Sequence, residues 1–406
     1  MNRARTPDRR VGAWKPRPFF LFLAWWLMVF SAAAVLPPAG SAPAQEVPPA
    51  NPNRPVSVPT AEPARPGATV LIYHRFGEED LPTTNIAADR FEEQLAFLRD
   101  NGYRVLALRD LAARLLQGEP LPDRSVVITI DDGYRSVYEV AWPLLRKYGF
   151  PFTVFVYVEA TDQGRRGYMN WNQIRELRDA GVDFQNHGYG HLHMAERRPG
   201  MTDQAYRAWI RADLAVSTRI LSQQLGQRPE FFAVPYGEYN QAVIDEARLF
   251  GYRAILMQDP GSVGADTDPL AIPREAILGE DWSTMEHFQM VLERVDLPLA
   301  DLEPVTAVRG EIPPRFSARL LYPERYRPGT LGIYVTELGW RQAVVEDGRV
   351  IVANDQPLTR PINRVAVSGR EKESNRTAIR YWLLVAEEPV ESMDGIHFGS
   401  GGMTMK

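Results

Sequence analysis

Two adjacent carboxylates at the end of an apolar, β-branched run are the first residues of this chain that could do chemistry. The run extends from Val126 to Ile130, and Asp131, Asp132 and Gly133 follow it. Two neighbouring carboxylates repel each other when both are charged, so the arrangement persists most easily if a cation binds one or the other takes up a proton. A buried parallel strand with acids at its carboxyl end is where α/β barrels hold their catalytic groups.

A histidine cluster lies farther along the chain. Of the 6 histidines, three fall within seven residues, at His187, His191 and His193. Two imidazoles four residues apart around flexible glycines can converge on one ion, and an aspartate completes a site that leaves positions open for water and substrate. The alternative is that these histidines make hydrogen bonds within a turn. The carboxylate pair at a strand end favours a metal site.

Three motifs together resemble the polysaccharide deacetylase family, the NodB-homology carbohydrate esterases. Residues 129–133 read T-I-D-D-G, where the family usually has T-F-D-D-G. Residues 186–191 read N-H-G-Y-G-H and match N-H-[ST]-x-x-H except at Gly188. Residues 232–237 read F-A-V-P-Y-G and match the third motif around Pro-Tyr-Gly. The motifs occur in the family's order within residues 69–295.

The resemblance implies a role for each motif residue. Asp132, His187 and His191 would hold the metal, and Asp131 would be the general base that deprotonates a water. The water would attack an N-acetyl carbonyl, and the metal and the backbone N–H of Tyr236 would hold the resulting oxyanion. The implied cofactor is a divalent metal. Zn²⁺ is the first choice and Co²⁺ or Ni²⁺ are alternatives, because a His₂Asp site suits all three.

The chain departs from the family pattern in two places. Many members have an arginine two residues before the proline of the third motif, where this chain has Ala233; Arg274 is a candidate replacement, and a surface ion-pair partner is the alternative. The late Leu-x-His strand that supplies the general acid is missing. His74 instead ends an early strand-like run, which resembles the permuted branch of exported poly-N-acetylglucosamine deacetylases. We therefore expect His74 to protonate the leaving amine, against a structural histidine at a strand end.

Four residues are candidates for substrate contacts: Tyr168, Trp171, Pro235 and Arg274. Aromatic faces stack on pyranose rings, whereas core packing is the alternative for Trp171, which opens an amphipathic helix. His193 is expected to support the site rather than to bind the metal.

The pattern of segments predicts an α/β fold followed by an all-β domain. Strands and helices alternate over residues 69–295, which predicts a parallel sheet with helices outside it, and the family resemblance implies a distorted (β/α) barrel. Short strand-like runs without a helical period then cover 316–388, with a hairpin turn at Asp347-Gly348. We assign 68–300 to the barrel, 301–390 to a small sandwich-like domain and 391–406 to a disordered tail.

The amino terminus has the order of a secretory signal. Residues 1–18 carry six basic residues and one acid, an uncharged apolar stretch follows at 19–36, and Ala42-Pro43-Ala44 within residues 1–44 provides a small-residue cleavage site. The alternative is an uncleaved membrane anchor formed by 19–36. The proline-rich residues 45–67 are expected to form a disordered linker. The body of the protein is therefore expected to be periplasmic or secreted, or anchored to the inner membrane.

Charge and composition exclude some classes of partner. The chain has a formal net charge of −5, and residues 45–406 alone carry 40 bases and 50 acids. An acidic body without a basic stripe argues against nucleic acid, and the absence of cysteine excludes disulfides. We predict a metal-dependent hydrolase that removes N-acetyl groups from poly-N-acetylglucosamine or, as second choice, peptidoglycan. The alternatives are an O-acetyl esterase and a non-catalytic carbohydrate-binding protein on the same scaffold.

Overall fold

The computed structural model of the chain describes residues 67–78 and 80–387. The predicted signal segment, the tail and all but the last residue of the linker lie outside these ranges. Within them, no helix combines the length and the apolar character needed to cross a membrane.

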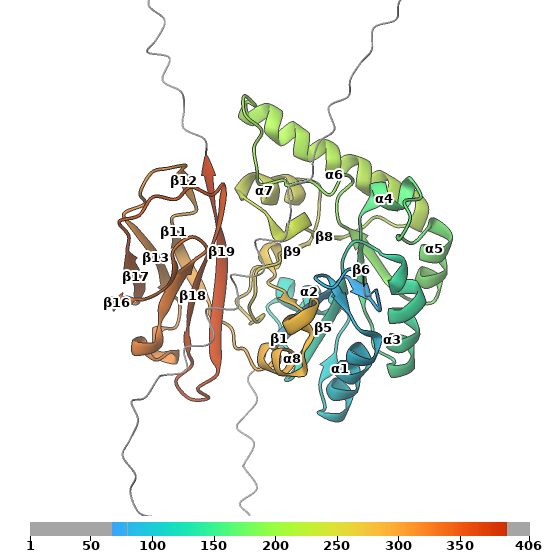
Figure 1. Cartoon of the computed structure of the whole chain (residues 1–406), viewed down its shortest axis with the longest axis horizontal. Helices are drawn as coiled ribbons and strands as arrows, with labels where there is room; N and C mark the ends of the chain where they lie inside the picture. The colour runs from blue at the N-terminus through green and yellow to red at the C-terminus, as the bar shows by residue number, and fades with distance from the viewer. Residues whose placement is uncertain (1–66, 79, 388–406) are drawn as a thin grey trace, which may run out of the picture. The chain divides into compact units, whose positions relative to one another are not determined.

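A parallel sheet forms the centre of the amino-terminal part (Figure 1). Its strand order is β10-β1-β5-β6-β7-β8-β9, with the short β4 beside β5. The β-branched and apolar sequences of the central strands bury both faces, as parallel sheets covered by helices require. The strands are β1 (Ala68–Tyr73), β4 (Arg104–Val105), β5 (Ser125–Ile130), β6 (Thr153–Val156), β7 (Asp183–Asn186), β8 (Phe231–Ala233), β9 (Ala254–Leu256) and β10 (Glu275–Ala276).

The segment from Ile272 to Ala276 joins the two edges of this sheet. Ile272 pairs in parallel with Leu256 of β9, and three residues later Glu275 pairs in parallel with Leu71 of β1. The sheet therefore closes into a distorted barrel, which confirms the predicted fold class. Arg274 lies on this closing segment.

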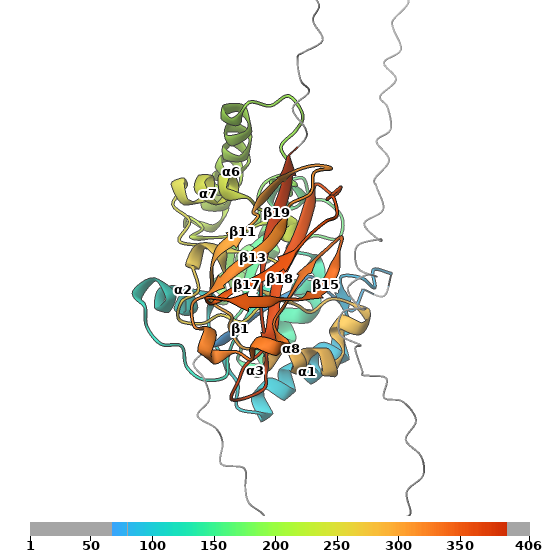
Figure 2. The same cartoon turned by 90° about the vertical axis from the view of Figure 1, so that its left-hand side faces the viewer.

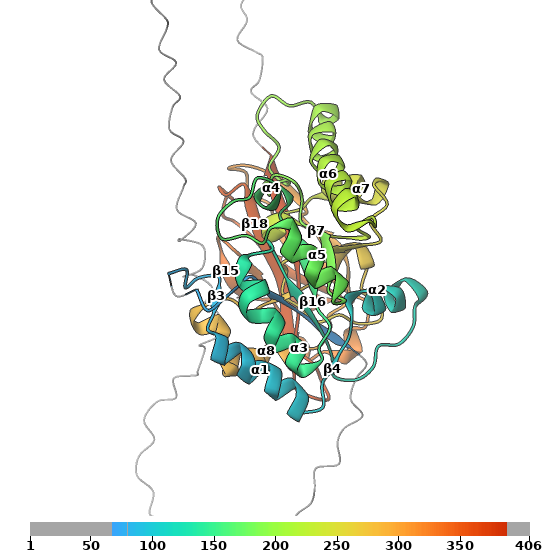
Figure 3. The same cartoon turned by 90° about the vertical axis from the view of Figure 1, so that its right-hand side faces the viewer.

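Helices cover the outside of the sheet (Figure 3). Each turns an apolar stripe inward, as α1 does with Phe91, Leu95 and Leu98. Thr202 caps the longest helix, because its Oγ1 accepts a hydrogen bond from the N–H of Ala205. The helices are α1 (Ala88–Asp100), α2 (Leu108–Gln117), a π-helical turn η3 (Val137–Ala141) that leads into α3 (Trp142–Tyr148), α4 (Val158–Asp162), α5 (Trp171–Asp179), α6 (Asp203–Leu225), α7 (Gln241–Leu249) and α8 (Met285–Leu292).

Short elements connect these parts. A small parallel pair, β2 (Arg75–Phe76) and β3 (Asn85–Ile86), follows β1. Single 3₁₀ turns complete the loops: η4 (Pro235–Gly237), η5 (Pro269–Ala271), η6 (Glu280–Ser283), η7 (Pro323–Arg325) and η8 (Pro328–Thr330).

Two further sheets form the carboxyl-terminal β-domain (Figure 2). One has the order β11-β13-β17-β16 and the other β12-β19-β18-β14-β15, and a shared apolar core that includes Phe316 and Trp382 is buried in this domain. The strands are β11 (Leu299–Glu303), β12 (Thr306–Val308), β13 (Arg315–Leu320), β14 (Gly332–Val335), β15 (Gly339–Gln342), β16 (Val344–Glu346), β17 (Arg349–Ala353), β18 (Ile362–Arg370) and β19 (Thr377–Glu387).

The turn between β16 and β17 is the one that the sequence predicts. Asp347 and Gly348 both have positive φ, at 48° and 76°, as the central residues of a tight hairpin require. Before this turn, the chain passes from one sheet to the other at Ala343, between β15 and β16.

The barrel and the β-domain share backbone pairing. Gly261, after β9, forms an antiparallel bridge with Arg380 of β19, and Val295 forms a parallel bridge with Ala378. Strand β19 therefore contacts loops of the barrel directly.

Candidate active site

Parallel strands deliver the predicted site residues to one edge of the barrel. His74 directly follows β1, Asp131 follows β5 and His187 follows β7. Tyr73 pairs with Ile130, and the N–H of Asp131 donates to the carbonyl of Tyr73 at 2.9 Å. His74 and Asp131 are thus the first residues after two neighbouring strands, and they lie at the same end of the barrel.

Three side chains converge as metal ligands would. Ligand atoms of Asp132, His187 and His191 all lie within 4.8 Å of one another. Oδ1 of Asp132 is 3.4 Å from Nε2 of His187 and 3.2 Å from Nε2 of His191. Both Asp132 Oδ1 and His187 Nε2 are buried, and neither has a hydrogen-bond partner among the described residues. Buried electron-pair donors that face one another without a proton between them fit a divalent cation.

The protonation states fit this reading. Nδ1 of His187 lies 2.8 Å from the carbonyl of Ala233, which places the ring proton on Nδ1 and leaves the Nε2 lone pair for a ligand. Burial lowers the pKa of His187 to about 4, so the ring is neutral at pH 7. Burial alone would raise the pKa of Asp132, but its interactions with His191, His74 and His187 keep that pKa below its ordinary value. A neutral imidazole and a carboxylate are the forms that bind a metal.

The base candidate Asp131 is held by Arg274. The guanidinium donates from Nη1 to Oδ1 at 2.7 Å and from Nη2 to Oδ2 at 2.8 Å, and both side chains are fully buried. Burial would raise the pKa of Asp131, but Arg274 and then His187 hold it below its ordinary value. Oδ2 is also 3.7 Å from Nε2 of His187, so its remaining lone pair faces the ligand cluster.

This geometry corrects the grouping of Arg274 with the substrate contacts. Its Nε donates to the carbonyl of Met257 at 2.7 Å, and Nη1 also reaches Oγ1 of Thr129 at 3.2 Å. A guanidinium at 0% exposure with donors taken by the protein does not reach a polysaccharide. It occupies instead the base-orienting place that Ala233 leaves open. Pro235 is likewise buried, so its side chain offers no surface for a sugar.

Aromatic rings border one side of the ligand cluster. Tyr168 packs on Tyr134 with ring centroids 4.8 Å apart and meets Tyr157 edge-on at 5.8 Å. Tyr157 and Tyr236 contact the His191 ring at 5.2 and 4.4 Å. These tyrosines are partly exposed and can stack on sugar rings.

Two other predicted residues lie outside the ligand cluster. Trp171 packs against the main apolar core and donates from Nε1 to Asp162 at 3.3 Å, which agrees with the core-packing alternative. His193 stacks on Tyr236 at 3.9 Å, and its Nδ1 lies 2.6 Å from Glu238. His193 therefore supports the rim and is not part of the metal cluster.

Asp213 of α6 is a site residue that no motif in the sequence indicates. Its carboxylate accepts hydrogen bonds from the N–H groups of Tyr189 and Gly190 at 2.8 and 2.7 Å, and so fixes the loop between the two ligand histidines. A Cβ on Gly188 would lie 3.0 Å from Asp213 Oδ1, which explains glycine where the family has Ser or Thr. The available signal was an acid on the buried face of an amphipathic helix.

Backbone conformation also marks the site. Asp132, His191 and Tyr236 have φ values of 71°, 49° and 59°. Each is a non-glycine residue in the left-handed region, which costs about 1–2 kcal/mol. Such conformations persist where surrounding structure holds them and concentrate at functional sites.

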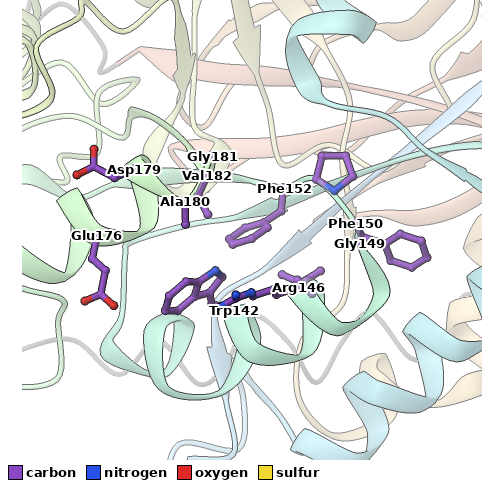
Figure 4. Close-up of a pocket in the computed structure, with 12 residues that line it drawn as sticks. Trp142, Arg146, Gly149, Phe150, Phe152, Glu176, Asp179, Ala180, Gly181 and Val182 are labelled. Carbon is purple, nitrogen blue, oxygen red and sulfur yellow. The ribbon is translucent and has the colours of Figure 1, made fainter.

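A separate pocket lies at the other end of the strands (Figure 4). It has a volume of about 670 Å³ and is lined by α3 and α5 residues such as Trp142 and Glu176, together with Phe152 and Val182. Phe152 and Val182 directly precede β6 and β7, so this pocket is at the amino ends of the strands, away from the ligand cluster.

Comparison with known proteins agrees with the motifs. Residues 118–255 match the family model of polysaccharide deacetylase. An Escherichia coli (strain K12) relative, named poly-beta-1,6-N-acetyl-D-glucosamine N-deacetylase, is 27% identical over an alignment of 261 residues that covers 56% of this chain and 38% of that protein. A Staphylococcus aureus (strain MRSA252) relative with the same name is 23% identical over 50% of this chain and 71% of its own.

A solved structure supports the fold. A de-N-acetylase from Aggregatibacter actinomycetemcomitans superposes with a TM-score of 0.50 at 21% identity, over 55% of this chain and 99% of that one.

Proposed function

We propose that this chain, of which residues 118–255 match the polysaccharide deacetylase family model, is a metal-dependent hydrolase that removes N-acetyl groups from a polysaccharide outside the cytoplasm. One observation carries the proposal. The partnerless atoms of Asp132 and His187 face each other beside a buried base that Arg274 orients. A protein that only bound carbohydrate would have no need for a buried, charged base at this position.

The substrate class follows from two features. Relatives in two bacterial groups are named poly-beta-1,6-N-acetyl-D-glucosamine N-deacetylases, and His74 supplies a histidine at the barrel mouth from the first strand. A β-1,6-linked N-acetylglucosamine polymer is therefore the first choice of substrate. Peptidoglycan is the second. The basic, apolar and small-residue order of 1–44 supports a location outside the cytoplasm.

The protein side chains divide the reaction between them. A bound Zn²⁺, Co²⁺ or Ni²⁺ would supply Lewis acidity to the acetyl carbonyl and lower the pKa of a water. Asp131 then accepts the proton of the attacking water, and Arg274 keeps its carboxylate in place. The N–H of Tyr236 donates to the oxyanion as it forms. His74 protonates the leaving amine. Burial lowers the pKa of His74 against the opposing effects of Asp132 and Asp131, so its protonated form gives up a proton more readily than an exposed imidazolium does.

Acetate release tests the function. We expect the full-length, Zn²⁺-loaded protein to release acetate from β-1,6-linked N-acetylglucosamine oligomers, to lose this activity after chelation and to regain it when Zn²⁺ is restored. Faster release from O-acetylated sugars would identify an esterase with the same site. A metal-loaded protein that binds the oligomers but releases acetate from neither substrate would contradict the enzyme proposal and support the non-catalytic alternative.

His74→Ala is expected to lower kcat by about 10²-fold with little change in KM, because general acid catalysis contributes about 10²–10⁴-fold. The loss should shrink for an activated aryl acetate, whose leaving group needs no proton. His287→Ala is a matched control. His287 lies on α8, packs on Trp282 and has its Nε2 3.1 Å from the carbonyl of Ala276. Equal losses on the amide and the aryl ester would show that His74 is not the acid.

A further inference from the structure

A polar cluster links the β-domain to the third motif. We call it the interdomain cluster: Tyr236, Tyr239, Asp259 and Arg364. Asp259 follows β9 and is 3% exposed, and the Tyr239 hydroxyl donates to its Oδ2 at 2.7 Å. Arg364 of β18 places Nε 3.8 Å from Oδ1 of Asp259. Its Nη2 donates to the backbone carbonyl of Tyr236 at 3.1 Å. A β-domain side chain thus contacts the turn that carries the proposed oxyanion donor.

The turn that Arg364 contacts is a strained one. Tyr236 has φ 59° and ψ 0°, and the hydrogen bonds from Gly237 to Val234 and from Glu238 to Pro235, at 3.0 and 3.2 Å, define a tight double turn. A non-glycine residue keeps this conformation only where its surroundings hold it. The bond from Arg364 is one such restraint, since it fixes the direction of the Tyr236 carbonyl.

The segment 257–259 is a second restraint on the same turn. A Cβ on Gly237 would lie 2.4 Å from Cβ of Gln258, so the turn packs directly on this segment. The carbonyls of Met257 and Asp259 accept hydrogen bonds from Nε and the backbone N–H of Arg274 at 2.7 and 2.9 Å. One short segment therefore supports both the turn and the arginine that orients the base, and its Asp259 carboxylate pairs with the β-domain.

We propose that Arg364 is a positioning residue that holds the Pro235–Gly237 turn in its catalytic conformation, so that the β-domain completes the active site. The proposal rests on the deacetylase function proposed above. It assigns to the β-domain a role in transition-state stabilisation. The Tyr236 carbonyl lies in the Tyr236–Gly237 peptide, so its hydrogen bond from Arg364 restrains the Tyr236 N–H through the backbone angles of Tyr236. A change in those angles would turn the N–H away from the developing oxyanion. The interaction grows as the carbonyl becomes an oxyanion, so its loss affects kcat more than KM.

Arg364→Met tests the proposal in the full-length, Zn²⁺-loaded protein. We expect kcat to fall about 10- to 100-fold, since small displacements of a positioned group reduce rates on this scale, with KM within about twofold. Arg364→Lys should retain part of the activity, and added guanidinium should partly rescue Arg364→Ala. Arg370→Met is the matched control on the same strand, because the Arg370 side chain bonds only to Asn375 and Thr377 among the described residues.

Amide hydrogen exchange gives a readout that does not depend on turnover. Arg364→Met should speed exchange in peptides that cover 234–240, leave 183–186 of β7 unchanged and leave Zn²⁺ affinity unchanged, whereas Arg370→Met should alter neither region. Unchanged exchange in 234–240, or a kcat equal to that of Arg370→Met, would overturn the positioning role. A wild type that releases no acetate would refute the proposed function instead, and the exchange result would still decide whether Arg364 holds the turn.

Discussion

Asp131→Asn is expected to lower kcat for acetate release by about 10³-fold while the protein still binds Zn²⁺. The size follows from the loss of a general base, which contributes about 10²–10⁴-fold. Asp131 lies outside the ligand cluster of Asp132, His187 and His191, so the metal should remain. Calorimetric Zn²⁺ titration and steady-state kinetics on N-acetylated oligomers measure the two quantities.

Stability must be followed in the same variant. The Asp131 carboxylate accepts one hydrogen bond from each of two guanidinium nitrogens of Arg274. An asparagine would present its NH₂ group to one of these nitrogens instead of an acceptor, so the buried guanidinium would lose one hydrogen bond and its counter-charge. Asp162→Asn is a control at an exposed acid that contacts only Trp171 in the described structure. If Asp131→Asn remains folded, binds Zn²⁺ and deacetylates at the wild-type rate, then Asp131 is not the base.

The sequence sufficed for groups whose geometry is set by neighbouring residues. Asp132 is fixed by its place at the end of β5, and His187 and His191 are four residues apart on one loop, so local spacing predicts that they can share one ion. Positions at strand ends are similarly informative. His74 could be placed at the barrel mouth because parallel strands share one edge.

Contacts between distant segments could not be predicted in the same way. Asp213 reaches the loop of Tyr189 and Gly190 from a long helix, and the hydrogen bond from Arg364 to Tyr236 spans 128 residues. Neither contact leaves a periodic or spacing signal, because each depends on how α6 and the β-domain pack. Arg274 was a candidate for the base-orienting residue. Only the closure of the sheet through Ile272–Ala276 shows how it reaches Asp131.

Arg274→Met is expected to reduce the free energy of unfolding by about 3–5 kcal/mol, because breaking a buried ion pair leaves an unpaired charge in the interior. The Asp131 carboxylate and the guanidinium are both at 0% exposure. Urea unfolding of the full-length protein measures the change. Arg294→Met is a matched control, since Arg294 pairs with Glu275 in an equally buried setting at 2.6 Å, and it should lose comparable stability.

The two variants should differ in their pH dependence. Arg274 holds the pKa of Asp131 below its ordinary value, so this carboxylate contributes stability above its ordinary pKa and loses that contribution as the pH falls through the folded-state pKa. Without Arg274 the pKa of Asp131 rises. The acidic limb of kcat/KM should then move to higher pH in Arg274→Met and stay in place in Arg294→Met. An unchanged limb in Arg274→Met would mean that Arg274 does not tune the base.

A double-mutant cycle separates pairing from the other contacts of Arg274. In Arg274→Met with Asp131→Asn, both charges are gone, so the double variant should be more stable than the sum of the single losses predicts. A coupling of about 1–3 kcal/mol is expected for residues in direct contact. Additive losses would indicate that Arg274 stabilises the barrel through Thr129 and Met257 alone. In that case the position of Asp131 at the end of β5, and not its contact with the Ile272–Ala276 segment, would orient its carboxylate.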